Sequence, residues 1–243
     1  MCAKVFFAGA SGAVGRRLLP LLLARGYRVL AVSRDPARAE ALRTAGAEAQ
    51  VLDVFDGDAL SRAMLEFSPQ WVVHQLTDLP PALDPARMAA AASRNAHLRR
   101  EGTANLVAAA RVAGARRLVA QSIAWAYAPG PQPHREDQPL DLAAEGPRAV
   151  SVGGVAALEE AVLGAAPLEG LVLRYGRLYG PGTGFDEPDP RLALHVDDAA
   201  RAALLALEWG TPGCYNLAER DLDVSSALAR YRLGWQPGFR LEA

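Results

Sequence analysis

The chain has 243 residues, a formal charge of −1 and an apolar fraction of 51%. This length suits one α/β domain, and the apolar content is enough for a large core, which excludes a disordered or fibrous protein. Acidic and basic residues nearly balance, without a long run of either sign, so we expect no general binding to nucleic acid and none to a membrane.

The cysteine content and the start of the chain give an expectation about the compartment. Cys2 and Cys214 are too few and too far apart for a disulfide framework or a zinc site, so we expect a reducing cytoplasm and no bound metal. The apolar run after Lys4 is only four residues long before Gly9. It is too short for a signal peptide or a membrane span.

Short apolar runs alternate with helical periodicity along the chain. Expected strands cover residues 5–8, 28–32, 49–52, 71–75, 117–121 and 171–174. Expected helices cover residues 14–24, 36–44, 84–113 and 152–163, with others near Asp58 and up to about Glu208. The alternation predicts an α/β fold with a doubly wound parallel sheet and helices on both faces. The proline-rich stretches 129–147 and 180–190 are expected to be irregular, the first of them a surface excursion.

A glycine-rich turn lies between the first strand and the first helix. Glycine permits positive φ and a close approach of backbone to phosphate, and the free N–H groups of a helix N-terminus favour an anion. A turn of this kind after the first strand indicates dinucleotide binding. The residues expected to hold the phosphates are Gly9, Ser11, Gly12, Ala13, Val14 and Gly15.

The spacing of these glycines resembles that of the short-chain dehydrogenase/reductase superfamily, in particular its extended and atypical branch of NAD(P)-dependent epimerases and dehydratases. Segments 51–54, 101–106, 173–182 and 195–200 extend the resemblance over most of the chain. It implies one NAD(P)-binding Rossmann domain over residues 1–243, with residues 175–243 contributing a small substrate-side lobe. Residues 183–192 lead almost at once to His195, so this lobe is expected to be abbreviated.

The end of the second strand bears on the choice of cofactor. Arg34 offers a guanidinium for a ribose 2′-phosphate, with Ser33 beside it, so NADP is preferred to NAD. Asp35 is the competing interpretation, because an acid there could reach an unphosphorylated ribose. The resemblance implies that Asp53 and Val54 contact the adenine. It also implies that Gln75 and Leu76 line the cofactor pocket, where His74 is expected to be a bulky strand-end residue.

The family's usual catalytic pair is missing. Relatives use Tyr-x-x-x-Lys on the helix after the fifth strand, where the lysine lowers the pKa of the tyrosine and binds the nicotinamide ribose. This chain has one lysine, Lys4, among 26 basic residues, so the motif cannot occur. If Glu159 is aligned with the glutamate that commonly follows the motif, Ser151 and Val155 take the two places. Arginine elsewhere is not expected to substitute easily.

Two other residues remain as catalytic candidates. Ser122, at the end of the fifth strand, could hydrogen-bond a substrate oxygen, and Tyr127 could donate a proton; both could equally be pocket wall. His195 and Asp197 invite a charge-relay interpretation with Ser122. The resemblance instead makes them structural, with Asp197 capping the following helix.

The sequence therefore favours an NAD(P)-dependent oxidoreductase acting on a small carbonyl or alcohol of unknown identity, with a proton from Tyr127 or water. One alternative is an NADP-binding or NADP-sensing protein without turnover. A further alternative, a nucleotide-sugar epimerase or dehydratase, rests on resemblance alone. Relatives often form homodimers through two long helices, which here would be residues 84–113 and 152–163.

Overall fold

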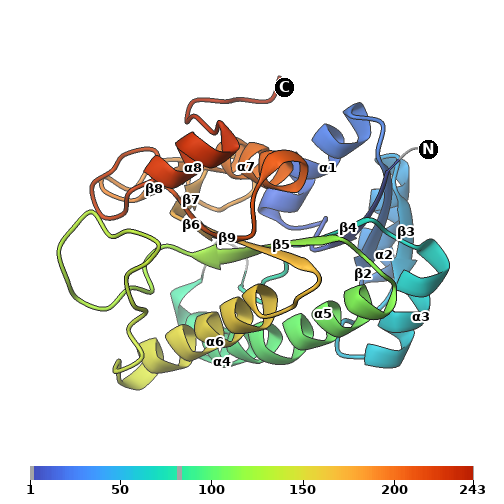
Figure 1. The fold of residues 1–243 in the computed structure, drawn as a ribbon, viewed down its shortest axis with the longest axis horizontal. Helices are drawn as coiled ribbons and strands as arrows, with labels where there is room; N and C mark the ends of the chain where they lie inside the picture. Colours follow the sequence, from blue (N-terminus) through green and yellow to red (C-terminus); the bar gives the residue numbers. More distant parts are fainter. Residues whose placement is uncertain (1–2, 81–83, 243) are drawn as a thin grey trace.

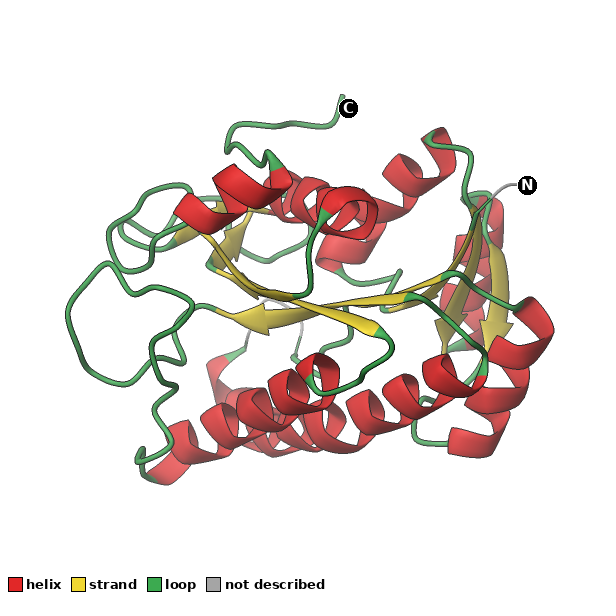
Figure 2. Cartoon of the chain, viewed as in Figure 1, coloured by secondary structure: helices red, strands yellow, loops and turns green. Residues whose placement is uncertain are grey.

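The computed structural model describes residues 3–80 and 84–242. Its centre is a parallel seven-stranded sheet with strand order β3-β2-β1-β4-β5-β6-β9 (Figures 1 and 2). The strands are β1 (Lys4–Ala8), β2 (Arg28–Ser33), β3 (Glu48–Val51), β4 (Trp71–His74), β5 (Arg117–Ile123), β6 (Glu169–Tyr175) and β9 (Gly213–Leu217). The expected doubly wound α/β fold is confirmed.

Helices cover both faces of the sheet. Helices α1 (Ala13–Ala24), α7 (Val196–Trp209) and α8 (Ala227–Leu233) pack on one face, the upper one in Figure 1. On the lower face lie α3 (Gly57–Phe67), α4 (Pro85–His97), a π-helical turn η2 (Leu98–Gly102), α5 (Thr103–Val112) and α6 (Gly146–Leu163). Helix α2 (Pro36–Thr44) connects β2 and β3.

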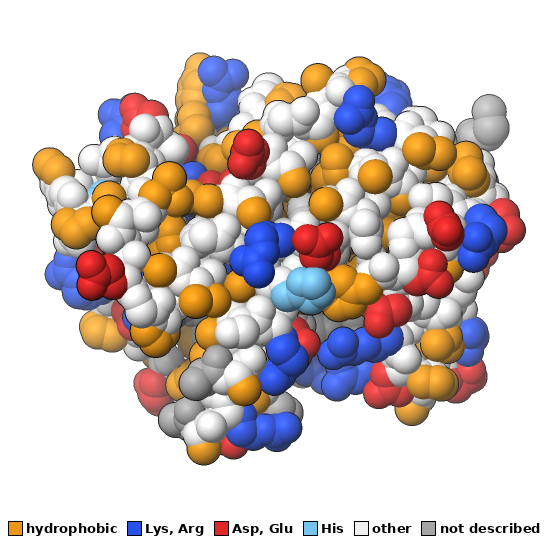
Figure 3. Space-filling model, turned by 90° about the horizontal axis from the view of Figure 1, so that it is seen from below, with side chains coloured by type: hydrophobic (Ala, Val, Ile, Leu, Met, Phe, Trp, Pro, Cys, Tyr) orange, Lys and Arg blue, Asp and Glu red, His pale blue; other side chains and the backbone are white. Residues whose placement is uncertain are grey.

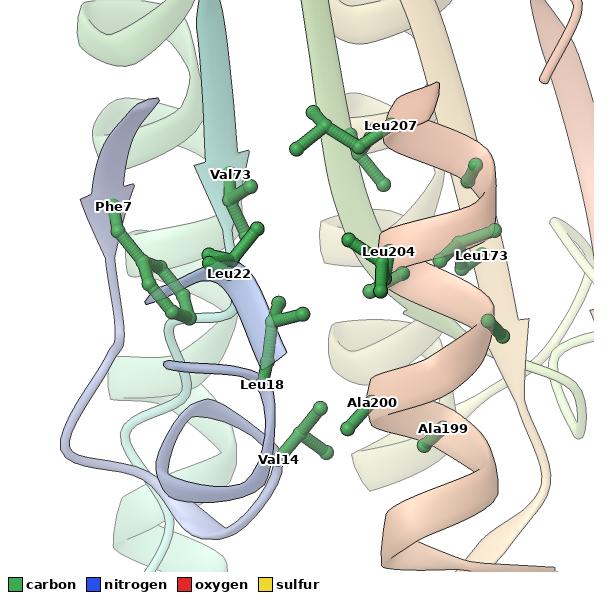
Figure 4. Packing of buried hydrophobic residues seen from close by; sticks show 14 of the residues in the cluster. Phe7, Val14, Leu18, Leu22, Val73, Leu173, Ala199, Ala200, Leu204 and Leu207 are labelled. Carbon is green, nitrogen blue, oxygen red and sulfur yellow. The ribbon is translucent and has the colours of Figure 1, made fainter. Parts of the chain in front are cut away.

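The two hydrophobic layers follow from the alternation of side chains along each strand. Phe6 and Val72 point into the layer under α3, α5 and α6, whereas Phe7 and Val73 point into the layer under α1 and α7. Figure 4 shows this second layer, in which the leucines of α1 face small alanines and leucines of α7. The alanines on α7 allow α1 and α7 to approach closely, so the two helices cover this face of the sheet beside the phosphate turn.

The part of the chain after residue 175, which was expected to contribute a small substrate-side lobe, supplies both a short strand pair and elements of the main layers. Strands β7 (Arg177–Tyr179) and β8 (Ala193–His195) form a small parallel pair, but α7 and β9 then return to the main layers. Trp235 is fully buried in the core under α1 and α7. Strand β9 was not predicted, because Pro212 and Gly213 at its start indicate a turn and the run that follows them is short.

The strand order reverses between β1 and β4, and ligands of open α/β sheets bind at the carboxyl edge at such a point. A cavity lies at the opposite edge, between the end of α5 and the segments that lead into β5 and β6. Figure 3 shows the face below the sheet, where acidic and basic side chains are interspersed with apolar atoms. Among the described helices, none has the length and apolarity needed to cross a membrane.

Candidate active site

The phosphate turn has the backbone geometry that its glycines predicted. Gly9 has φ +96°, and a Cβ atom there would lie 2.5 Å from the carbonyl carbon of Gln75. A Cβ at Gly15 would overlap the Gly9 carbonyl oxygen. Helix α1 starts at Ala13 and, within the described chain, has neither a side-chain cap nor an acidic residue in its first turn. Its first N–H groups are therefore left for an anion.

The turn opens into a cleft at the carboxyl edge of β1, β2 and β4. Side chains and backbone from all the expected cofactor segments line it except Ala13, Val14 and Gly15, which lie within α1. Val14 is buried against α7, so only its backbone is available to a phosphate. The lining residues include Gly9, Ser11, Gly12, Ser33, Arg34, Arg38, Asp53, Val54, Gln75, Leu76 and Leu98.

At the β2 end of this cleft, the carboxylate of Asp35 is used locally. It caps α2 by accepting hydrogen bonds from the N–H groups of Ala37 (2.8 Å) and Arg38 (3.3 Å). Arg34 and Arg38 both line the cleft, and their side chains are largely exposed. Arg34 lies 3.6 Å from Asp78. Arg38, in the first turn of α2, was missed from the sequence.

Near the expected adenine position, Asp56 and Asp53 accept hydrogen bonds from different segments of the backbone. Asp56 caps α3 by accepting from the N–H of Ala59 (2.9 Å). Asp53 accepts from the N–H of Phe55 (3.0 Å) and lines the cleft beside Val54. Asp53 therefore keeps an oxygen free for a ligand donor.

At the end of β4, Gln75 and His74 point to opposite sides of the sheet. Gln75 donates to the hydroxyl of Tyr175 (3.2 Å), while its Oε1 is enclosed without a partner among the described residues. His74 is fully buried between the Thr103 hydroxyl (3.0 Å) and the N–H of Leu76 (3.3 Å). Burial, and then the charge of Arg99, lower its pKa to about 4. His74 is thus neutral and fixes the backbone of Leu76 at the cleft.

The two catalytic candidates lie in one buried polar network. The Tyr127 hydroxyl donates to Asn216 Oδ1 (2.7 Å) and accepts from Arg174 Nη1 (2.6 Å). Its ring stacks on His134, and the residue is 4% exposed. Burial raises the pKa of Tyr127 to about 12, although the Arg174 guanidinium opposes this. A hydroxyl with both functions engaged inside the protein is a poor donor to a substrate.

Ser122 belongs to the other end of the same network. Its hydroxyl donates to Glu159 Oε1 (2.7 Å). The same carboxylate binds Arg174 through Nε (2.9 Å) and Nη2 (2.6 Å), and both side chains are only 6% exposed. This buried ion pair joins α6 to β6 beside the end of β5. It was missed from the sequence, where Glu159 was noted only as an alignment marker.

The places of the missing pair on α6 carry no acid–base group. Ser151 is half-buried, and Val155 is fully buried with Ile123, Ala126 and Val152. Valine cannot bind ribose hydroxyls or lower a neighbouring pKa.

The segment around His195 is structural, with one correction to the expected roles. His195, not Asp197, is the N-cap of α7, and its Nδ1 accepts from the Asp197 N–H (3.2 Å). Asp197 instead forms an ion pair with Arg17 of α1 and accepts from the N–H of Leu241 (3.0 Å). Because the Asp197 carboxylate is turned toward α1, these residues hold helices together and form no relay with Ser122.

Comparison with known proteins agrees with this geometry. The sequence model of a family described as NAD(P)H-binding matches residues 9–184. A "3-diazoavenalumate denitrifying reductase" from a Streptomyces species is 45% identical over 240 residues, covering 90% of this chain and 76% of that protein. A dTDP-4-dehydrorhamnose reductase of Streptomyces griseus is 34% identical over 176 residues, covering 72% of this chain and 49% of that one.

Solved structures share the fold. A UDP-glucose 4-epimerase of Thermotoga maritima with UDP-glucose has a TM-score of 0.78 at 18% identity, covering 96% of this chain and 93% of that one. DesIV, a dTDP-glucose 4,6-dehydratase of Streptomyces venezuelae with NAD and TYD bound, has a TM-score of 0.77 at 18% identity, covering 98% and 92%.

Fold and cleft together define a dinucleotide-binding protein with the Rossmann fold. The chain belongs to the NAD(P)H-binding family, and two reductases are among its relatives.

Proposed function

We propose that this protein is an NADPH-dependent reductase whose substrate takes up hydride without a proton from the enzyme, and that this substrate is an aryl diazonium compound. The observation that carries the proposal is the pair of residues on α6. If Glu159 is aligned with the glutamate that follows the family motif, Ser151 and fully buried Val155 take the places of its tyrosine and lysine. A reductase without that pair is best suited to a reduction in which the enzyme does not have to protonate the product.

The chemistry of a diazonium group meets this condition. Reduction of a carbonyl leaves an alkoxide that must be protonated, so it needs an acid at the reacting oxygen. In a diazonium compound the carbon gains a hydride, the C–N bond breaks, and dinitrogen leaves with the bonding electrons. Bound NADPH would supply the hydride. The name of the relative at 45% identity describes a reductase that removes nitrogen from a diazo compound, which supports this choice.

The β2 end of the cleft favours NADPH over NADH. The Asp35 carboxylate is engaged in capping α2, so it is poorly placed to accept from a free ribose 2′-hydroxyl. Arg34 and Arg38 line the same end with two guanidinium groups. A ribose 2′-phosphate is the group that two arginines bind best.

The residues around the reacting position would shape the pocket without exchanging protons. Tyr127 and Ser122 are enclosed in the network of Arg174 and Glu159, with exposures of 4% and 2%. In this proposal they hold the ends of β5 and β6 in place. Trp125, at 39% exposure, is left on the surface beside them, with Arg177 over its ring.

The test uses a carboxylated aryl diazonium salt as the probe, with a reaction lacking enzyme as the control for spontaneous reduction. We expect enzyme-dependent loss of NADPH absorbance at 340 nm, one dinitrogen released per NADPH, and deuterium from C4-labelled NADPH at the carbon that held nitrogen. A matched panel of aldehydes and ketones should be reduced more slowly.

Two results would contradict the proposal. Rapid reduction of carbonyls with no enzyme-dependent reaction of the diazonium probe would favour the carbonyl reductase expected from the sequence. Tight NADPH binding without turnover of either panel would favour a binding or sensing protein.

A further inference from the structure

Residues Leu98–Gly102 form a π-helical turn between α4 and α5. The wider turn directs both Leu98 and Arg99 inward, while Arg100 and Glu101 stay exposed. Turns of this type cost regular hydrogen bonding and occur frequently at functional sites. Here the turn places a charged side chain inside the protein.

Arg99 is only 6% exposed, yet among the described residues it has no hydrogen bond and no ion pair. Arg174, which is buried to a similar degree, donates two hydrogen bonds to the Glu159 carboxylate. Burial lowers the pKa of Arg99 to about 10, while the Glu159 carboxylate raises it. Arg99 is therefore a protonated cation at neutral pH, and a buried cation of this kind calls for acceptors.

The donors of Arg99 are not sealed off. In the described chain, the enclosed polar side-chain atom that lacks a partner is Gln75 Oε1. The guanidinium nitrogens of Arg99 are not in this class, so they keep some accessible surface. The charged end of Arg99 is therefore not fully enclosed.

Its position is fixed by the packing of two helices. A Cβ at Gly154 of α6 would lie 2.9 Å from the Cα of Ala96, so α4 and α6 touch at this level, and they lie side by side on the lower face in Figure 1. Arg99 follows Ala96 by less than one turn. Helical side chains tilt toward the N-terminus, so Arg99 extends toward the carboxyl edge of the sheet, near the level of Val155.

The charge of Arg99 acts on groups on both sides of this position. It lowers the pKa of His74 at the end of β4, and it interacts with Glu159 beside the end of β5. Arg34 and Arg38 lie at the other end of the cleft, beside β2. A dinucleotide crosses such a sheet from the β2 side toward the far strands, so its nicotinamide half reaches the β4 and β5 side.

We propose that Arg99 binds the hydroxyl oxygens of the nicotinamide ribose, and so supplies from the π turn the cation that α6 lacks at Val155. The planar guanidinium presents parallel N–H donors that suit two neighbouring hydroxyl groups. Arg99 is then a cofactor-positioning residue.

The test compares two ligands in direct binding measurements. NADPH contains the nicotinamide ribose, whereas 2′,5′-ADP contains only the adenine half with its 2′-phosphate. Arg99→Gln should raise the Kd for NADPH at least about tenfold and change the Kd for 2′,5′-ADP less than twofold, because one charge-assisted contact is lost at one end. Arg99→Lys should recover part of the loss.

Two controls separate this role from a structural one. Arg100→Gln, on the exposed side of the same turn, should leave both Kd values unchanged. Arg99→Met should keep or raise the melting temperature of the ligand-free protein, since it removes a buried charge without a partner. A strong fall in that melting temperature, equal losses for both ligands, or no change for NADPH would overturn the proposal. Neither ligand contains a diazo group, so the outcome is independent of the proposed reaction.

Discussion

The Arg174–Glu159 ion pair makes the sharpest stability prediction for this protein. The Glu159 carboxylate receives hydrogen bonds from Arg174 Nε (2.9 Å), Arg174 Nη2 (2.6 Å) and Ser122 Oγ (2.7 Å). In Glu159→Gln the negative charge disappears while Arg174 stays buried, so its cation is left with neutral acceptors: the new amide oxygen, the Tyr127 hydroxyl and the Glu136 carbonyl. Breaking a buried pair in this way costs about 3–5 kcal/mol of unfolding free energy.

The assay is urea unfolding followed by circular dichroism, with the exposed pair Arg28–Glu48 as the reference. Glu48→Gln should cost less than about 1 kcal/mol, because exposed ion pairs contribute little. For a chain of this size, the loss at Glu159 corresponds to a melting temperature lower by roughly 10 °C. The double variant Glu159→Leu with Arg174→Met should lose less unfolding free energy than the two single variants lose in sum, because it leaves neither charge unpaired. A cost below about 1 kcal/mol for Glu159→Gln would refute the argument.

Further predictions concern the cofactor, the network and pH. Tyr127→Phe should leave turnover of the folded enzyme within about twofold while costing about 1 kcal/mol of stability; a large loss of turnover would restore Tyr127 as proton donor. Arg34→Ala should weaken NADPH about tenfold more than NADH in fluorescence titrations, and Arg38→Ala should act in the same direction; equal losses would count against a 2′-phosphate contact. Gly9→Ala should abolish detectable binding of both dinucleotides, since its Cβ would overlap Gln75. His74 has a folded pKa near 4 against 6.5 in the unfolded chain, so unfolding takes up a proton between these values. Stability should therefore fall by up to about 3 kcal/mol as pH drops from 6.5 to 4, and His74→Asn should flatten this dependence in acid titrations.

Several site features were within reach of the sequence because they depend on neighbouring residues. The glycines at positions 9, 12 and 15 follow a strand and precede a helix, so their geometry is local. The choice between Arg34 and Asp35 needed the structure, because it depends on whether the Asp35 carboxylate is engaged at the start of α2.

The sequence could not reveal the roles of groups that meet across the sheet. Tyr127 and Asn216 are 89 residues apart, and their hydrogen bond decides that the tyrosine is enclosed. In the sequence, nothing distinguishes Arg99 from its neighbour Arg100. Only the π turn directs it inward, toward Glu159 of a helix far along the chain.

By itself, the sequence determined the alternation of strands and helices, the phosphate turn and the absence of a catalytic lysine. These features depend on residue identity or on neighbours a few positions apart. The tertiary structure decided which charges are partnered, which hydroxyl groups are enclosed, and that α7 and β9 complete the main layers. Such properties depend on groups brought together from distant parts of the chain, and the low polarity of the interior makes each pairing, or its absence, count.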